Sequence, residues 1–150
     1  MSGAKWAVTA GAVTNVVPER CVIVVDEALP PGLAANAAGV LATTLGSILP
    51  GLVGDAFIDA DGHLHPGLIR TVLPVLRAPS SRLSEVRADA LESALDVVDF
   101  PAFGQQTNDY DEFCAQIART PAAQLRYLGI ALYGPRRPVA RLTGSLPLLR

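Results

Sequence analysis

The stretch VVDEALPPGLAANAAG, residues 24–39, decides the fold. It joins the end of a β-branched run to an alanine-rich segment through a Pro-Pro-Gly turn. A buried strand is expected over residues 20–26 and a helix over 32–49, where apolar residues recur at helical spacing. Such a turn presents the positive end of the helix, a usual ligand site in α/β proteins. No basic residue follows it here, and Asn36 is the strongly polar side chain nearest the turn.

Strands and helices alternate along the rest of the chain. AFIDADGHLHPGL (56–68) predicts a hairpin with its turn at Asp61-Gly62, and RTVLPVLR (70–77) a core strand whose proline indicates an edge or a bulge. A helix capped by Ser81 should follow, and then a short strand, LDVVDF (95–100), that ends at Asp99. After it we expect a helix capped by Asn108, a strand over 125–134 and a closing helix over 135–144. This order predicts an α/β protein with helices layered on one sheet. We expect a single domain over residues 20–150, preceded by an N-terminal extension, 1–19.

The amino-acid composition favours association with a second copy of the chain. Half of the residues are hydrophobic and 17% are charged, against about 25% in typical domains, so some apolar surface is expected to face a second copy of the chain. Residues 28–54 carry no charge, but three prolines and five glycines interrupt them. We therefore expect a helix buried by the sheet and by a second subunit, in a cytoplasmic homodimer, rather than a membrane span or a signal peptide.

Charge is unevenly distributed along the chain. All fourteen acids lie at or before Glu112, while residues 113–150 hold six arginines and no acid. This C-terminal segment is a candidate for contact with an anion such as tRNA, although a solvated and partly self-neutralising surface is the simpler explanation. The two cysteines, Cys21 and Cys114, form no disulfide framework, and we expect both to be reduced and buried.

One cluster has metal-ligating chemistry. His63 and His65 share one face of a strand, with Asp59 and Asp61 nearby. Turn chemistry explains the aspartates more simply, and DADGHLH lacks the pattern of a calcium loop, so we expect no metal and no cofactor. The sequence motifs of nucleophilic serine hydrolases, phosphate-binding loops and dinucleotide sites are absent.

The closing stretch LGIALYGPRRPVARLTGSLPLL, residues 128–149, resembles the end of type-2 peptidyl-tRNA hydrolases, including a Thr-Gly-x-Leu motif that begins at Thr143. Residues 21–38 are similar to the first unit of that family, with Gly32 before the helix and a double alanine within it. VVDEALPPGLAANAAGVL, the DADG hairpin and GPR before the last helix resemble more closely an uncharacterised bacterial family, regarded as a divergent branch of those hydrolases. The resemblance covers residues 20–150.

This resemblance implies a mixed four-stranded sheet with helices on both faces, a homodimer, and an ancestral activity that cleaves the ester between peptide and tRNA. The hydrolases carry a lysine directly after the glycine, where this chain has Leu33. Asp99 follows the third strand as the family's acid does. DFPAFGQQT alters the motif's spacing, however, and leaves Gln105, Gln106 and Thr107 only as approximate counterparts. Arg136 or Arg137 would have to replace the missing charge.

Two hypotheses follow. In the first, the protein is a hydrolase of peptidyl-tRNA or a related ester or amide, with Asp99 as acid or base and Thr107 and Asn36 as orienting groups. Its substrate would contact a further set of residues: Gly32, Leu33, Gln106, Arg136, Arg137 and Thr143. In the second, a non-catalytic homodimer has kept the scaffold and binds a small ligand or RNA. The sequence does not choose between them, because function depends on the site rather than on the fold.

Overall fold

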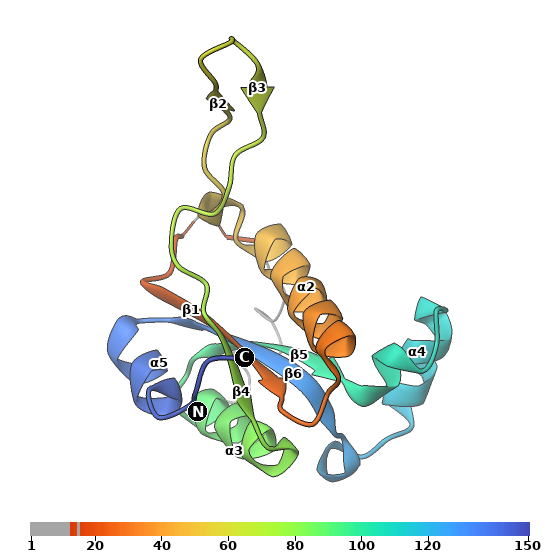
Figure 1. Ribbon diagram of the computed structural model, residues 1–150. Coiled ribbons are helices and arrows are strands. Elements are labelled where there is room, and N and C mark those ends of the chain that lie inside the picture. The colour runs from red at the N-terminus through yellow and green to blue at the C-terminus, as the bar shows by residue number, and fades with distance from the viewer. Residues whose placement is uncertain (1–12, 15) are drawn as a thin grey trace.

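A computed structural model of the chain describes residues 13–14 and 16–150, so most of the predicted N-terminal extension lies outside the described part. Four strands form the main sheet: β1 (Arg20–Asp26), β4 (Val75–Ala78), β5 (Asp96–Pro101) and β6 (Tyr127–Gly134). Their order is β4-β1-β6-β5, in which β1 and β4 are parallel and the other pairs antiparallel. The predicted α/β fold with a mixed four-stranded sheet is confirmed (Figure 1).

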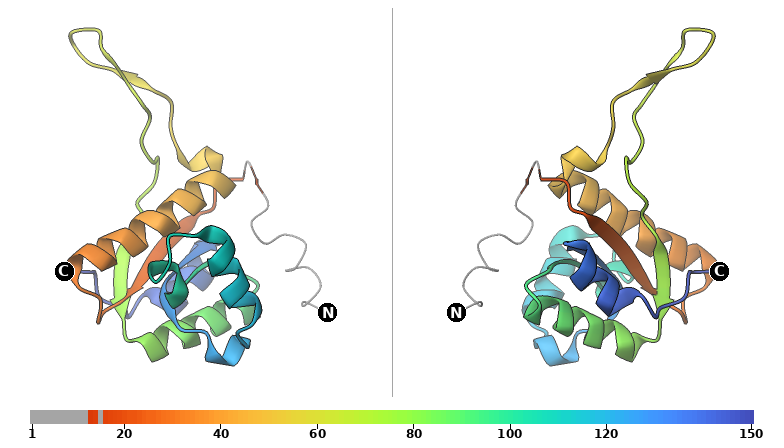
Figure 2. Two further views of the ribbon diagram at one scale, coloured as in Figure 1. Left: turned by 90° about the vertical axis from the view of Figure 1, so that its right-hand side faces the viewer. Right: turned by 90° about the vertical axis from the view of Figure 1, so that its left-hand side faces the viewer.

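Helices cover both faces of this sheet (Figures 1 and 2). Successive side chains of a strand point to opposite faces. Cys21, Ile23 and Val25 of β1 accordingly pack in the core under α2 (Pro31–Ile48), and the alternate residues Val22 and Val24 pack in a second core. That second core lies under α3 (Ser80–Glu92) and α5 (Arg136–Thr143).

Helix α2 follows the opening turn and begins on a proline. Pro31 occupies a first-turn position, where its missing N–H costs nothing. Five residues at helical spacing face the sheet: Ala34, Ala37, Leu41, Leu45 and Ile48. The described chain covers only this face of α2, so its predicted burial by a second subunit stays a prediction. In the described part of the chain, no helix has both the length and the apolar character needed to cross a membrane.

The two edges of the sheet differ. At β4, the end of the chain adds a short antiparallel segment: the Arg77 amide donates to the Pro147 carbonyl at 3.0 Å and the Leu149 amide to the Val75 carbonyl at 2.9 Å. At the other edge, β5 pairs with β6 and with no further strand of the described residues. The outward-facing backbone groups of β5 are therefore open to another partner.

A hairpin arm, residues 53–69, projects far from the body of the molecule (Figures 1 and 2). It contains two short antiparallel strands, β2 (Phe57–Ile58) and β3 (Leu64–His65). Gly62 takes a positive φ of 88° in the turn between them, which glycine adopts at little cost. The hairpin predicted around Asp61-Gly62 is confirmed.

Several predicted boundaries are wrong. The strand expected over residues 70–77 begins only at Val75, after Pro74, as β4. Helix α3 begins at Ser80 with Pro79 at the cap position, so Ser81 does not cap it. Helix α4 (Tyr110–Ala118) is capped by Asp109, one residue after the predicted Asn108. Its carboxylate accepts from the amides of two residues in the first turn, at 2.9 and 3.2 Å. Strand β5 continues to Pro101 instead of ending at Asp99, because its pairing with β6 continues past that residue.

The packing of α2 on the sheet predicts a large difference between two adjacent residues. Leu41 is 1% exposed, whereas Val40 is 40% exposed. Leu41→Ala should lower the free energy of unfolding by about 2–5 kcal/mol, because it removes buried apolar contacts and leaves a cavity. Val40→Ala should cost less than about 1 kcal/mol. Urea unfolding followed by circular dichroism measures both, and equal losses would contradict this packing.

Candidate functional site

A groove of about 620 Å³ runs along the open edge of the sheet. Helix α2 forms one wall, the middle of β5 forms the floor, and the short helix η2 (Ala102–Gln105) with α4 forms the other wall. The lining residues of this α2–α4 groove are Leu33, Asn36, Val40, Thr44, Val98, Asp99, Phe100, Gly104, Thr107, Asn108, Asp109, Tyr110 and Phe113. Its volume is within the range of small-molecule sites.

The groove has a mixed lining with no basic residue. Its apolar side chains come from both walls and the floor, while Asn36 and Thr44 on α2 are neutral hydrogen-bonding groups. The turn of η2 packs tightly against the floor: a Cβ on Gly104 would lie 2.1 Å from the Phe100 ring. Glycine is therefore required where the outer wall joins the sheet. Helix α4 has no buried residue, so this wall stands away from the core.

The carboxylate of Asp99 points away from the groove. Its neighbours Val98 and Phe100 pack in the core under α2, so Asp99 faces the other side of the sheet. There, Arg87 of α3 donates from Nε to Asp99 Oδ1 at 2.7 Å. The Arg87 guanidinium also lies 5.0 Å from the centre of the Tyr127 ring. Asp99 therefore lines the groove through its backbone, while its carboxylate contacts Arg87.

This ion pair is half-buried. Burial lowers the pKa of Arg87, but the hydrogen bond and the charge of Asp99 outweigh burial and raise it above its ordinary value. Both side chains are less than one third exposed, at 27% and 29%. Asp99 thus anchors edge strand β5 to helix α3.

Of the other predicted site residues, Leu33, Asn36 and Thr107 line the groove together. The Thr107 hydroxyl donates to Glu112 at 2.9 Å and accepts from the Asp109 amide at 3.0 Å, so it contributes to the start of α4. Gly32 lies in the first turn of α2, and Gln106 is exposed directly after η2.

Three other predicted residues belong to α5, which covers the opposite face of the sheet. Arg136 and Arg137 are exposed at its beginning, where the Arg136 amide donates to Glu19 at 2.8 Å. Thr143 is 2% exposed, and its hydroxyl donates to the carbonyl of Val139 at 2.8 Å. The structure therefore does not bring these three residues to the groove.

One arginine of the C-terminal segment does reach the opening turn. Arg126 donates from Nη2 to Asp26 Oδ2 at 2.9 Å, across 100 residues of sequence. Asp26 ends β1 and is 1% exposed; its second oxygen accepts from the Ala28 amide at 2.9 Å. The acid before the Pro-Pro-Gly turn is thus neutralised by a cation that no local pattern identifies.

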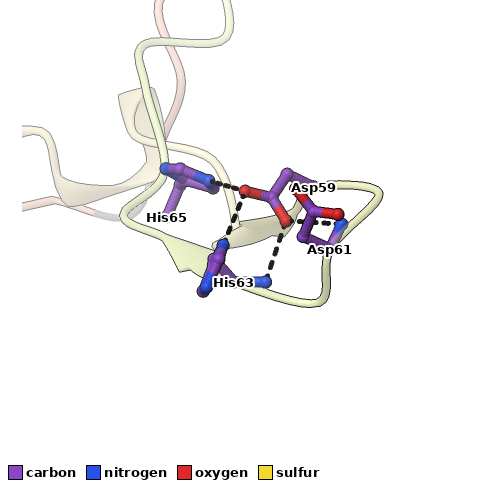
Figure 3. Close-up of polar contacts among 4 residues, drawn as sticks. All are labelled: Asp59, Asp61, His63 and His65. Carbon is purple, nitrogen blue, oxygen red and sulfur yellow. Dashed lines mark hydrogen bonds and ion pairs between the residues drawn. The ribbon is translucent and has the colours of Figure 1, made fainter.

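A separate polar cluster lies at the tip of the hairpin arm (Figure 3). Asp59 Oδ2 is 3.2 Å from His63 Nδ1 and 3.1 Å from His65 Nε2. Asp59 Oδ1 accepts from the amides of Asp61 and His63, each at 2.9 Å. Hydrogen bonds from the His63 amide and from His65 are the main causes that lower the pKa of Asp59. The side chains of Asp59, Asp61 and His63 place ligand atoms within 4.8 Å of one another.

The chain belongs to the family described as "Protein of unknown function (DUF2000)", whose model matches residues 19–150. Among solved structures, it is similar to Atu0240 of Agrobacterium tumefaciens strain C58, itself described as a protein of unknown function. The TM-score is 0.82 at 14% identity, over 90% of this chain and 100% of the other. This likeness shows a shared fold. No curated protein matches the chain.

The two thiols differ, which corrects the expectation that both are buried. Cys21 lies in the core, and burial raises its pKa to about 11, whereas Cys114 on α4 is exposed. One thiol per chain, Cys114, should therefore react with dithiobis(nitrobenzoate) in the native state, and the second only on unfolding. Cys114→Ser should abolish the native reaction. Fast reaction of both thiols in the folded wild type would contradict the burial of Cys21.

Proposed function

We propose that this protein binds a small, neutral, largely apolar ligand in the α2–α4 groove without transforming it. One observation carries the proposal: the lining of the groove combines apolar side chains with neutral polar ones and has no basic residue, while the Asp99 carboxylate is paired on the other face of the sheet and the Asp109 carboxylate caps α4. A site of this composition gains affinity from apolar burial and orientation from a few neutral polar groups.

The hydrolase hypothesis lacks its chemical groups at this site. In the hydrolases, ester cleavage uses an acid or base within hydrogen-bond reach and a positive charge for the oxyanion. Here Asp99 is paired with Arg87 and Asp109 caps α4. Leu33 supplies no charge, and Arg136 and Arg137 begin a helix on the opposite face. The relation to type-2 peptidyl-tRNA hydrolases thus stays a proposal about ancestry and fold rather than about activity.

The same reasoning disfavours an anionic ligand in this groove. A phosphate group would meet two aspartate positions and no cation among the lining residues. A neutral ligand would instead find the amide of Asn36, the hydroxyl of Thr44 and the outer backbone groups of edge strand β5. These groups are arranged around an apolar floor formed by Val98 and Phe100.

N-phenyl-1-naphthylamine, a neutral apolar fluorophore, tests this assignment. Wild-type protein should bind it with enhanced emission. Val40→Glu should weaken binding by at least about tenfold, because an unpaired carboxylate would be placed against an apolar ligand.

The matched control is Val72→Glu, at a residue that is 73% exposed and outside the groove lining. It should bind the fluorophore as wild type does. Undiminished binding by Val40→Glu, or no binding by the wild type, would contradict the proposal.

We also propose that two copies associate through the hairpin arm. Six large apolar side chains are exposed on it: Val53, Phe57, Ile58, Leu64, Leu68 and Ile69. An isolated two-stranded hairpin is marginally stable in water, so contact with another surface would stabilise it. A second copy offers the same surface in a self-complementary arrangement.

Sedimentation equilibrium tests this association. Wild type should have twice the chain mass at micromolar concentration. Ile58→Ser with Leu64→Ser, which changes a cross-strand pair at the arm, should shift the protein towards the monomer, while Val72→Ser should not. A wild-type monomer would contradict association through the arm.

A further inference from the structure

We propose that the tip of the hairpin arm binds a divalent transition-metal ion of the zinc type, with Asp59, His63 and His65 as ligands and Asp61 beside them. The inference is independent of the groove, because it rests on the side chains drawn in Figure 3. Both histidines of the chain are in this cluster.

Both histidines turn a ring nitrogen towards the same oxygen of Asp59. The two imidazole nitrogens lie 3.2 and 3.1 Å from the same carboxylate oxygen. Zinc takes nitrogen and oxygen ligands at about 2.0–2.2 Å, so two of its donors at a tetrahedral angle lie about 3.3 Å apart. Each imidazole nitrogen therefore already has nearly the spacing from the carboxylate oxygen that a shared zinc ion requires. Rotation of the exposed histidine side chains would bring both nitrogens to one ion beside Asp59.

The surrounding residues hold these donors in place. Asp59 Oδ1 is engaged by two backbone amides, which fixes the carboxylate and leaves Oδ2 facing the histidines. The His65 ring stacks on Phe57 across the hairpin, with ring centres 5.1 Å apart. Such outer contacts orient the ligands of metal sites.

The donor set and the exposure indicate which ions suit the site. Imidazole suits zinc and its neighbours, such as copper and nickel, whereas magnesium and calcium prefer oxygen ligands alone. The side chains of Asp59, His63 and His65 are 38%, 75% and 44% exposed, so an ion reaches them directly and water can complete its coordination. A bound ion would join the ends of β2 and β3, which pair over two residues each.

Titration of the full chain, without a histidine tag, with Zn²⁺ tests the site by calorimetry and by NMR of the imidazole protons. One equivalent should bind, and both histidine signals should shift together. His63→Gln and His65→Gln should each weaken binding by at least about tenfold. Mg²⁺ and Ca²⁺ should leave the histidine signals unchanged.

Two control variants distinguish Zn²⁺ binding at this site from Zn²⁺ binding by other side chains of the chain. Asp55→Asn, at an exposed carboxylate on the same arm, and Cys114→Ser, at the exposed thiol, should both bind Zn²⁺ as wild type does. The histidine variants keep the backbone bonds of the turn, and circular dichroism checks that they fold. Zn²⁺ binding that leaves both histidine signals unmoved, or that survives in the double histidine variant, would overturn the proposal.

Discussion

The two-residue period of edge strand β5 is the constraint on which the site depends. Val98 and Phe100 belong to the core under α2, so Asp99 between them must face α3. A shift of one residue in the pairing of β5 with β6 would exchange these faces and place a carboxylate in the groove. The observed register instead gives the groove an apolar floor and gives α3 an ion pair.

Charge pairing over long sequence distances has a related effect. Arg87 forms an ion pair with Asp99, and Arg126 forms one with the buried Asp26 at the end of β1. Removal of either arginine would leave a partly or fully buried carboxylate without its partner, an expensive arrangement. These two cations therefore stabilise the sheet, Arg87 at edge strand β5 and Arg126 at the end of interior strand β1. The uneven charge along the sequence does not by itself create a basic surface at the groove.

Patterns that depend on neighbouring residues could be predicted from the sequence. The β-branched run of β1, the proline turn before α2 and the Asp-Gly hairpin are local signals, and each element is present. Helix caps were less predictable, since neighbouring polar residues such as Asn108 and Asp109 compete for one position.

The candidate site was only partly predictable. Asn36 and Thr107 were expected near a ligand and do line the groove. The direction of Asp99 could not be predicted, because it depends on strand register. Its partner Arg87 is 12 residues away on another element, and the partner of Asp26 is 100 residues away. No local spacing encodes such pairs, and the projection of the hairpin arm likewise depends on the whole fold.

We infer that Asp99 is a structural acid and that the groove binds its ligand without catalysis. Release of tRNA from a peptidyl-tRNA is the most direct test of this claim. Purified wild type and Asp99→Asn should both release no more tRNA than a sample without protein. Release by wild type above that background, and its loss in a folded Asp99→Asn variant, would contradict the claim and return Asp99 to a catalytic role.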